Sequence, residues 1–214
     1  MRHTIGGVLC ALIATSVTLN AGHSWAETLG GSVTGGTTTG DFELLASAPA
    51  LAGPDAFDSP NLVAFDEQQD VELVSTLAIG PGISIPAGVV VSSHYVAFDP
   101  GVPSSVEGFI DFDEPILAVV GLPQSLAATE SLFASGSTNY SVGPAVGPEF
   151  QNMDQVFVSP NDRARLVFRA AGNSPGDQVR VLTGIIPEPA SIVLLIVAIG
   201  VSALGQPRAA AVNR

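Results

Sequence analysis

The chain has 214 residues, with 20 acidic side chains against 7 basic ones, and a formal net charge of −13. Every fully charged side chain from Glu27 through Asp162 is acidic, and such a field repels phosphate backbones, so we expect no nucleic-acid partner. The single cysteine, Cys10, lies in an apolar run near the N-terminus, which leaves no disulfide framework for the rest of the chain.

The N-terminus has the pattern of a secretory signal peptide. Arg2 provides a positive start, and Ile5 to Leu19 forms an apolar run. Ser24-Trp25-Ala26 then places small residues three and one positions before a cut. We therefore expect residues 1–26 to be removed by cleavage after Ala26. A buried N-terminal helix is the alternative.

Residues 27–60 are rich in Gly, Thr, Ala and Pro, which predicts a flexible lead-in, with a weak edge hairpin over 30–40 as the alternative. From residue 61 onward, short β-type runs alternate with turn residues. One helix is predicted, over residues 124–134. Strands are predicted over residues 71–79, 89–99, 106–113, 116–120, 154–159, 164–169 and 178–183.

The clearest strand pattern is that of residues 106–113. Every second residue from Val106 to Phe112 belongs to an apolar face, while Glu107, Asp111 and Asp113 share the other face, as in a strand with one dry and one wet side. Short strands at roughly ten-residue spacing favour a mainly β domain over residues 61–186, built as an antiparallel, jelly-roll-like β-sandwich. No repeat of fixed period is visible, which argues against a solenoid or propeller.

The last segment, residues 187–214, combines three features. Pro187-Glu188-Pro189 opens it, Ala190 to Gly205 is uncharged and apolar, and Arg208 and Arg214 follow. A helix over the apolar run would be about 24 Å long, against a bilayer core of about 30 Å. We expect one transmembrane helix, whose arginines stay in the cytoplasm while the preceding domain lies outside. An amphipathic C-terminal helix packed on the domain is the alternative.

This tail, behind a signal peptide, resembles the PEP-CTERM sorting domain. Pro187, Glu188 and Pro189 match the family's motif and the apolar run matches its helix, whereas Arg208 and Arg214 are spaced apart where family members have a tight arginine cluster. The resemblance implies recognition by exosortase, an integral-membrane cysteine protease or transpeptidase of Gram-negative bacteria that make extracellular polysaccharide. It further implies a transient inner-membrane anchor, then a place at the cell surface or in the extracellular matrix.

The body of the chain is also similar to exported proteins of this class that have no assigned activity. The similar segments are Ser93-His94-Tyr95 with Phe98-Asp99-Pro100, then residues 108–113 with 115–117, and finally residues 177–183. The resemblance implies a β-rich exported domain and supplies no catalytic residues.

No catalytic constellation stands out, so we do not expect an enzyme. His94 is the one histidine after the signal, and Ser92 or Ser93 could complete a Ser-His-Asp set, but no Gly-x-Ser-x-Gly elbow is present. We interpret His94 as a hydrogen-bonded core residue, because its strand face also carries valine and phenylalanine. One histidine without cysteine cannot fill a usual zinc site. Acidic pairs suited to glycoside hydrolysis would arise by chance among so many carboxylates.

No cofactor is expected, with calcium as the one candidate. Asp111 and Asp113 project from one strand face, and Asp99 ends the preceding strand, which would bring the three carboxylates together if the two strands paired as a hairpin. A solvated acidic surface is the alternative.

Two functional hypotheses follow. The first is an exported envelope or extracellular-matrix protein, associated with biofilm and polysaccharide. The second is a carbohydrate-binding β-sandwich module, stabilised by calcium, which requires aromatic side chains exposed on a flat or grooved face. Tyr95, Tyr140 and some phenylalanines are the candidates, since Trp25 leaves with the signal peptide.

Overall fold

The computed structural model describes residues 26–53, 55–80, 82–140, 148, 154–172 and 176–185. Among these residues, no helix is both long and apolar enough to cross a membrane. Residues 1–25 of the predicted signal segment and the whole tail lie outside the described residues, including the sites predicted at Pro187, Glu188, Pro189, Arg208 and Arg214. Ala26, the predicted cleavage position, is described and is 1% exposed.

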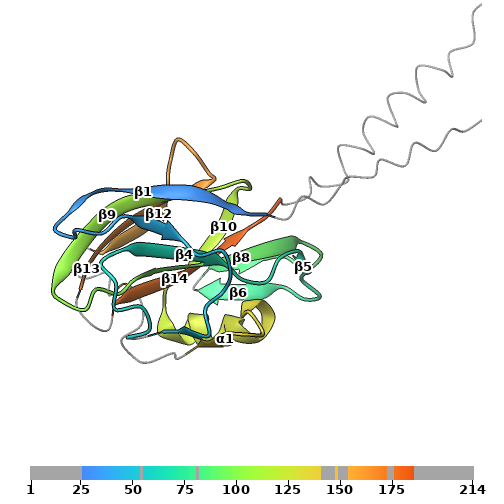
Figure 1. Cartoon of the computed structure of the whole chain (residues 1–214). Coiled ribbons are helices and arrows are strands. Elements are labelled where there is room, and N and C mark those ends of the chain that lie inside the picture. The colour runs from blue at the N-terminus through green and yellow to red at the C-terminus, as the bar shows by residue number, and fades with distance from the viewer. Residues whose placement is uncertain are drawn as a thin grey trace, which may run out of the picture.

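The described chain is mainly β, as predicted, with one short helix (Figure 1). In chain order the elements are β1 (Thr28–Gly36), β2 (Phe42–Leu44), β3 (Leu51–Ala52), β4 (Leu62–Asp66), β5 (Val71–Glu72), β6 (Leu77–Gly80), β7 (Ile83–Ile85), β8 (Val90–Phe98), β9 (Ser104–Phe112), β10 (Ile116–Val120), α1 (Pro123–Phe133), β11 (Asn139–Tyr140), β12 (Gln155–Val158), β13 (Arg165–Gly172) and β14 (Asp177–Thr183).

Two sheets form the body. Sheet A has the strand order β1-β9-β13-β12, and sheet B has the order β10-β14-β8-β4-β2, with β5 paired to the start of β8. Strand alternation turns one side of each sheet toward the other. Both sheets contribute to one apolar core, which includes Ile110, Leu166 and Phe168 of sheet A and Leu62, Val96, Phe98 and Val179 of sheet B. The two sheets therefore lie face to face.

The other side of sheet B is covered as well. Residues of α1 and of β6 and β7 form a second apolar cluster with Val91 and Leu182 of the sheet. Leu126 and Phe133 are buried residues of α1, seven positions apart and therefore on one face of the helix. Because sheet B is covered on both sides, every residue of β8 after Val90 is buried.

Most predicted elements are confirmed to within a few residues, including the helix and the strands over 89–99, 106–113, 116–120, 154–159, 164–169 and 178–183. Residues 71–79 were predicted as one strand, which is wrong because residues 73–76 separate β5 from β6. A purely antiparallel arrangement is also wrong, since β2 pairs with β4 and β11 with β3 in parallel.

The structure differs from the expected flexible lead-in at residues 28–36. These residues form β1, an edge strand of sheet A that pairs with β9 along its length. A Cβ atom on Gly31 would lie 2.6 Å from the Phe109 carbonyl oxygen and 2.7 Å from the Phe42 ring. Glycine at this position permits close approach of neighbouring groups and does not signal a loose segment.

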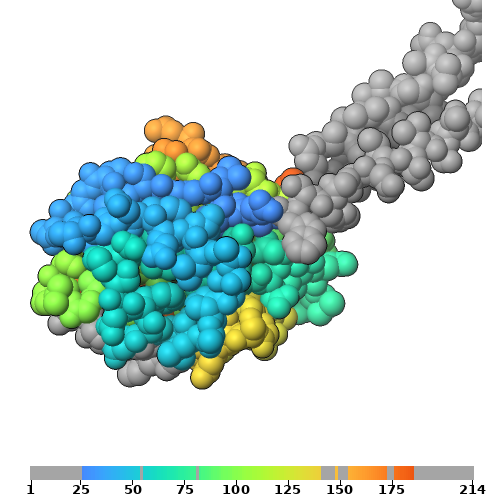
Figure 2. All heavy atoms as spheres, in the orientation of Figure 1, coloured from blue at the N-terminus to red at the C-terminus, as the bar shows by residue number. Residues whose placement is uncertain are grey.

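Both ends of the described domain lie at one pole of the molecule. Thr28 begins β1 and Thr183 ends β14, and the blue start of β1 lies beside the red end of β14 at the right of Figure 1, as it does in the space-filling view of Figure 2. We call this end the proximal pole. At the opposite end, which we call the distal pole, β1 ends, β8 ends at Phe98 and β9 begins at Ser104.

Candidate functional site

A buried polar cluster surrounds His94 at the proximal side of the core. His94 Nδ1 lies 2.7 Å from Asp66 Oδ1 and 3.2 Å from Thr28 Oγ1, and His94 Nε2 lies 2.9 Å from Thr183 Oγ1. The His94 ring also packs against Phe112, with the ring centroids 4.7 Å apart. One imidazole thus contacts the first strand and the last strand of the domain.

The order Thr183–His94–Asp66 is that of a nucleophile, a base and an orienting carboxylate. However, Thr183 and His94 are both 0% exposed, so a substrate cannot reach the threonine hydroxyl in this conformation. Ser92 and Ser93 do not contact His94: the Ser93 hydroxyl donates to Glu67, and that of Ser92 accepts from the Asp70 backbone N–H. The cluster therefore serves as a hydrogen-bonded link within the core.

The cluster also perturbs Asp66. Partial burial raises the pKa of this carboxyl group, but hydrogen bonds from His94 and Thr28, together with the positive charge of His94, outweigh burial. The pKa of Asp66 therefore falls below its ordinary value.

A second buried cluster lies on the α1 side of sheet B. Arg180 Nε and Nη2 donate to the two carboxylate oxygens of Glu67 at 2.6 and 2.8 Å, and the two side chains are 1% and 0% exposed. Arg180 Nη1 donates to the Leu126 carbonyl oxygen and to Thr129 Oγ1, both on α1. Burial lowers the pKa of Arg180, but the hydrogen bonds and charge of Glu67 raise it by a larger amount, so the net shift is upward. Arg180 therefore links α1 to sheet B, and Glu67 balances its charge.

The two tyrosines considered as a carbohydrate platform lie beside this ion pair. Tyr95 is 4% exposed and Tyr140 is 9% exposed, and their rings contact each other edge to face. Burial, followed by the charge of Glu67, raises the pKa of both hydroxyls. The Tyr95 hydroxyl donates to Gln178 Oε1, while Gln178 Nε2 is buried and has no hydrogen-bond partner among the residues that the structure describes. Neither tyrosine offers an exposed ring for a sugar.

The structure does not bring the three calcium candidates together. The expected hairpin between strands 89–99 and 106–113 is wrong, because β8 belongs to sheet B and β9 to sheet A. Asp99 follows β8 at the distal pole, whereas Asp113 follows β9 at the proximal pole. Across the described part of the chain, no group of three or more His, Cys, Asp or Glu side chains is placed to hold a metal ion.

Each of these carboxylates has partners within the protein. Asp99 is 1% exposed and accepts backbone N–H bonds from Phe57 and Gly176 at 3.0 and 3.1 Å. Asp111 accepts two bonds from Arg165 at 2.6 and 2.8 Å, and Asp113 accepts one from the Glu27 backbone N–H at 2.8 Å. Asp99 fixes distal loops, Asp111 belongs to a surface ion pair, and Asp113 holds the start of the domain.

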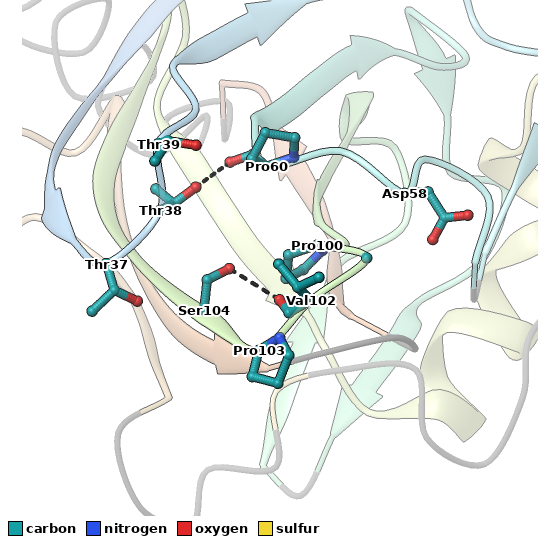
Figure 3. Close-up of a pocket in the computed structure, with 10 residues that line it drawn as sticks. Thr37, Thr38, Thr39, Asp58, Pro60, Pro100, Val102, Pro103 and Ser104 are labelled. Atoms are coloured by element: carbon teal, nitrogen blue, oxygen red, sulfur yellow. Dashed lines mark hydrogen bonds between the residues drawn. The ribbon is translucent and has the colours of Figure 1, made fainter.

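A pocket of about 400 Å³ opens at the distal pole (Figure 3). It lies between the segment after β1 and the β8–β9 connection. The Thr38 hydroxyl donates to the Pro60 carbonyl oxygen at 2.5 Å, and the Ser104 hydroxyl donates to the Val102 carbonyl oxygen at 3.3 Å. The lining residues are Thr37, Thr38, Thr39, Asp58, Pro60, Pro100, Gly101, Val102, Pro103 and Ser104. The size suits a small ligand, but the lining has no aromatic ring on which a sugar could stack.

The outer face of sheet A carries a second candidate surface. Phe157, Val167 and Phe109 are paired in register across β12, β13 and β9, and all three alternate with core residues, so they face away from the core. We call these three residues the aromatic row. The Phe157 side chain is 40% exposed, and the Arg165 guanidinium lies 4.0 Å from the centre of the Phe109 ring.

Ion pairs flank the aromatic row on both sides. Arg165 pairs with Asp111 next to one side, and Arg169 lies 3.8 Å from Glu107 next to the other. Rows on one face of a sheet are about 7 Å apart along the strands, because side chains alternate every ~3.3 Å. The result is an apolar strip bordered by charged groups that can hydrogen-bond a ligand.

Comparisons with protein-family models, curated proteins and solved structures found no match. The candidate sites therefore rest on the geometry of this chain.

Sequence reasoning did not identify the aromatic row. The one sequence feature that pointed to this row was the alternation of residues 106–113, which places Phe109 on the wet face between Glu107 and Asp111. Phe157 and Val167 could not be assigned to the same surface without the register of β12, β13 and β9.

Proposed function

We propose that this chain is an exported protein of the cell envelope or extracellular matrix, without catalytic activity, that an exosortase sorts by its PEP-CTERM-like tail. Residues 1–26 would act as the signal peptide. The tail would hold the domain at the inner membrane until it is cut near Pro187-Glu188-Pro189, with Arg208 and Arg214 on the cytoplasmic side. We further infer that the domain is a β-sandwich of the jelly-roll kind.

The Pro187-Glu188-Pro189 motif and the uncharged run after it carry this proposal, and the position of the domain's two ends supports it. During export, a signal segment and a C-terminal anchor lie in the same membrane, so the two ends of the folded domain must come close to one face of it. Thr28 and Thr183 meet at His94, which is compatible with this arrangement.

The proposal is tested by expressing the full chain, with and without residues 187–214, in a host that has an exosortase. A third variant, with Pro187 and Pro189 both changed to alanine, keeps the apolar run and alters only the motif. We expect the full chain to be shortened and leave the inner membrane, and the motif variant to remain there uncut. A motif variant that is cut and released as well as the full chain, or a full chain that stays uncut in the inner membrane, would refute sorting by the tail.

Carbohydrate binding is the second candidate function, and the aromatic row favours it. Exposed aromatic carbon beside groups that donate and accept hydrogen bonds is the combination that a sugar ring requires. Because Arg165 and Arg169 pair with Asp111 and Glu107, the surface is close to charge-balanced. A neutral polysaccharide therefore fits it better than an anionic one.

This second candidate is tested by glycan-array binding of the wild type and of a Phe157→Ala variant. Val102→Ala, which alters the distal pocket, is the matched control. We expect the row variant to lose binding and the pocket variant to retain it. Wild-type protein that binds no glycan would remove this candidate and leave sorting by the tail untouched.

A further inference from the structure

Exposed aliphatic side chains gather at the proximal pole. Val74 is 95% exposed, Ile185 is 65% exposed and Val90 is 37% exposed. They belong to the proximal ends of neighbouring chain segments: Val90 begins β8, Val74 lies two residues past β5, and Ile185 lies two residues past β14. We call these three residues the proximal patch.

The strand register places the proximal patch along one edge. Glu72 of β5 pairs with Val90, and Thr183 of β14 pairs with Ser92. A Cβ atom on Gly184 would lie 2.5 Å from the Val90 carbonyl oxygen, which places the neighbouring Ile185 near the start of β8. The Leu73 backbone N–H donates to the Val89 carbonyl oxygen, which holds the neighbouring Val74 beside the start of β8. Other aliphatic side chains are exposed elsewhere on the domain, but these three lie next to the end of the chain that leads to the apolar tail.

The length of chain between the patch and the apolar tail limits how far the patch can be from a membrane. Five residue steps lead from Ile185 to Ala190, where the uncharged run begins. A fully extended chain covers at most ~3.6 Å per residue, or about 18 Å here. The headgroup layer on each side of a bilayer occupies roughly 5–8 Å of that distance. A tail inserted at Ala190 therefore keeps the proximal pole within about 10–13 Å of the headgroup surface.

Charge at the same pole selects the kind of lipid. Asp113 and Glu114 form the turn between β9 and β10, and Glu72 lies beside Val90. These carboxylates give the pole a negative charge, and burial, followed by the charges of Asp113 and Asp70, raises the pKa of Glu114. Anionic headgroups would add to that repulsion. Zwitterionic headgroups instead present an ammonium group at the water-facing surface.

We propose that the proximal pole docks on the outer face of a bilayer of neutral, zwitterionic phospholipid while the tail is anchored, with Val74, Val90 and Ile185 in the headgroup region. This inference rests on the proposed membrane anchoring of the tail. Two contacts hold the domain with its proximal pole against the membrane: the aliphatic side chains lie in the interface, and the carboxylates pair with lipid ammonium groups. The distal pocket then points away from the membrane.

The orientation is tested with the full chain in phosphatidylcholine vesicles whose acyl chains carry bromine, which quenches nearby tryptophan fluorescence. Trp25→Phe removes the one native tryptophan. Into this background a single tryptophan is placed by Val74→Trp at the proximal pole, or by Val102→Trp at the distal pole as the matched control. Both positions are well exposed, at 95% and 69%, so both variants should fold, and far-ultraviolet circular dichroism checks this.

We expect brominated lipid to quench the tryptophan at position 74 at least twofold more than the one at position 102. We also expect quenching at position 74 to weaken when phosphatidylglycerol replaces part of the phosphatidylcholine. Equal quenching in chain that sediments with the vesicles would overturn docking and leave anchoring intact. Chain that does not sediment with the vesicles would overturn both docking and the anchoring on which it rests.

Discussion

Replacing Arg180 with methionine breaks the buried ion pair from one side. The variant removes the two hydrogen bonds that Arg180 gives to Glu67, while Ser93 Oγ still donates to that carboxylate at 2.6 Å. Because the Glu67 side chain is 0% exposed, its charge stays buried without a counter-ion. Such a loss costs about 3–5 kcal/mol, a large part of a total stability of roughly 5–15 kcal/mol.

The assay is urea unfolding of the full chain in mild detergent, followed by circular dichroism. With an m-value of about 2 kcal/mol/M, the Arg180→Met variant should unfold at a midpoint roughly 1.5–2.5 M lower in urea than the wild type. Arg169→Met is the matched control, because the Arg169 and Glu107 side chains are 47% and 53% exposed. Breaking such an exposed pair should cost no more than about 1 kcal/mol.

A double variant separates the ion pair from simple packing. Changing Glu67 and Arg180 together to methionine removes both charges, and replacing a buried pair with apolar side chains is often close to neutral. We therefore expect the double variant to regain most of the stability that Arg180→Met loses. If Arg180→Met lowers the midpoint no more than Arg169→Met does, the argument that this buried pair holds α1 on the sheet is refuted.

Three further predictions concern the His94 cluster, a close backbone approach and the calcium candidates. The pKa of Asp66 is lowered on folding, so its ionised form stabilises the protein above the unfolded pKa of about 3.8, and this stability is lost as the pH falls through the lower folded pKa. Asp66→Asn should therefore flatten this part of the acid-unfolding profile. An unchanged profile would contradict the lowered pKa of Asp66. A Cβ atom at Gly108 would lie 2.7 Å from the Ser32 carbonyl oxygen, so Gly108→Ala should lower the free energy of unfolding in urea by roughly 1–3 kcal/mol. Gly136→Ala is the control and should lower it far less, because a Cβ atom at Gly136 meets open space. Equal losses would show that the backbone around Gly108 shifts to accept the Cβ atom. Because Asp99, Asp111 and Asp113 each have protein partners, melting midpoints with calcium and with excess chelator should agree, and a higher midpoint with calcium would restore a metal site.

Local patterns predicted the strands well wherever one physical cause dominated. In β9 the alternation from Val106 to Phe112 reflects one buried and one exposed face, and it is confirmed. The strand over 89–99 was predicted from a β-type run between turn residues, and β8 is buried on both faces because the second apolar cluster, which includes α1, covers the outer side of sheet B. The glycines of β1 were misleading, because close packing and flexibility both favour the same residue.

Long-range pairing explains what the sequence pattern could not predict. Glu67 and Arg180 are 113 positions apart, and no local signal marks a surface-type residue as half of a buried pair. Consecutive strands usually pair, yet β8 and β9 belong to different sheets, which separates Asp99 from Asp111 and Asp113. His94 was correctly interpreted as a hydrogen-bonded core residue from its apolar strand face, but its link between the two ends of the domain required the positions of Thr28 and Thr183.

The most direct test of sorting by the tail is the intact mass of the exported protein, purified from matched hosts with and without an exosortase. With the exosortase, the mass should correspond to a chain that begins at Glu27 and ends near the Pro-Glu-Pro motif, without the apolar run from Ala190 to Gly205. Without the exosortase, the mass should include the complete tail through Arg214. A product that keeps residues 187–214 in both hosts would contradict the proposed sorting.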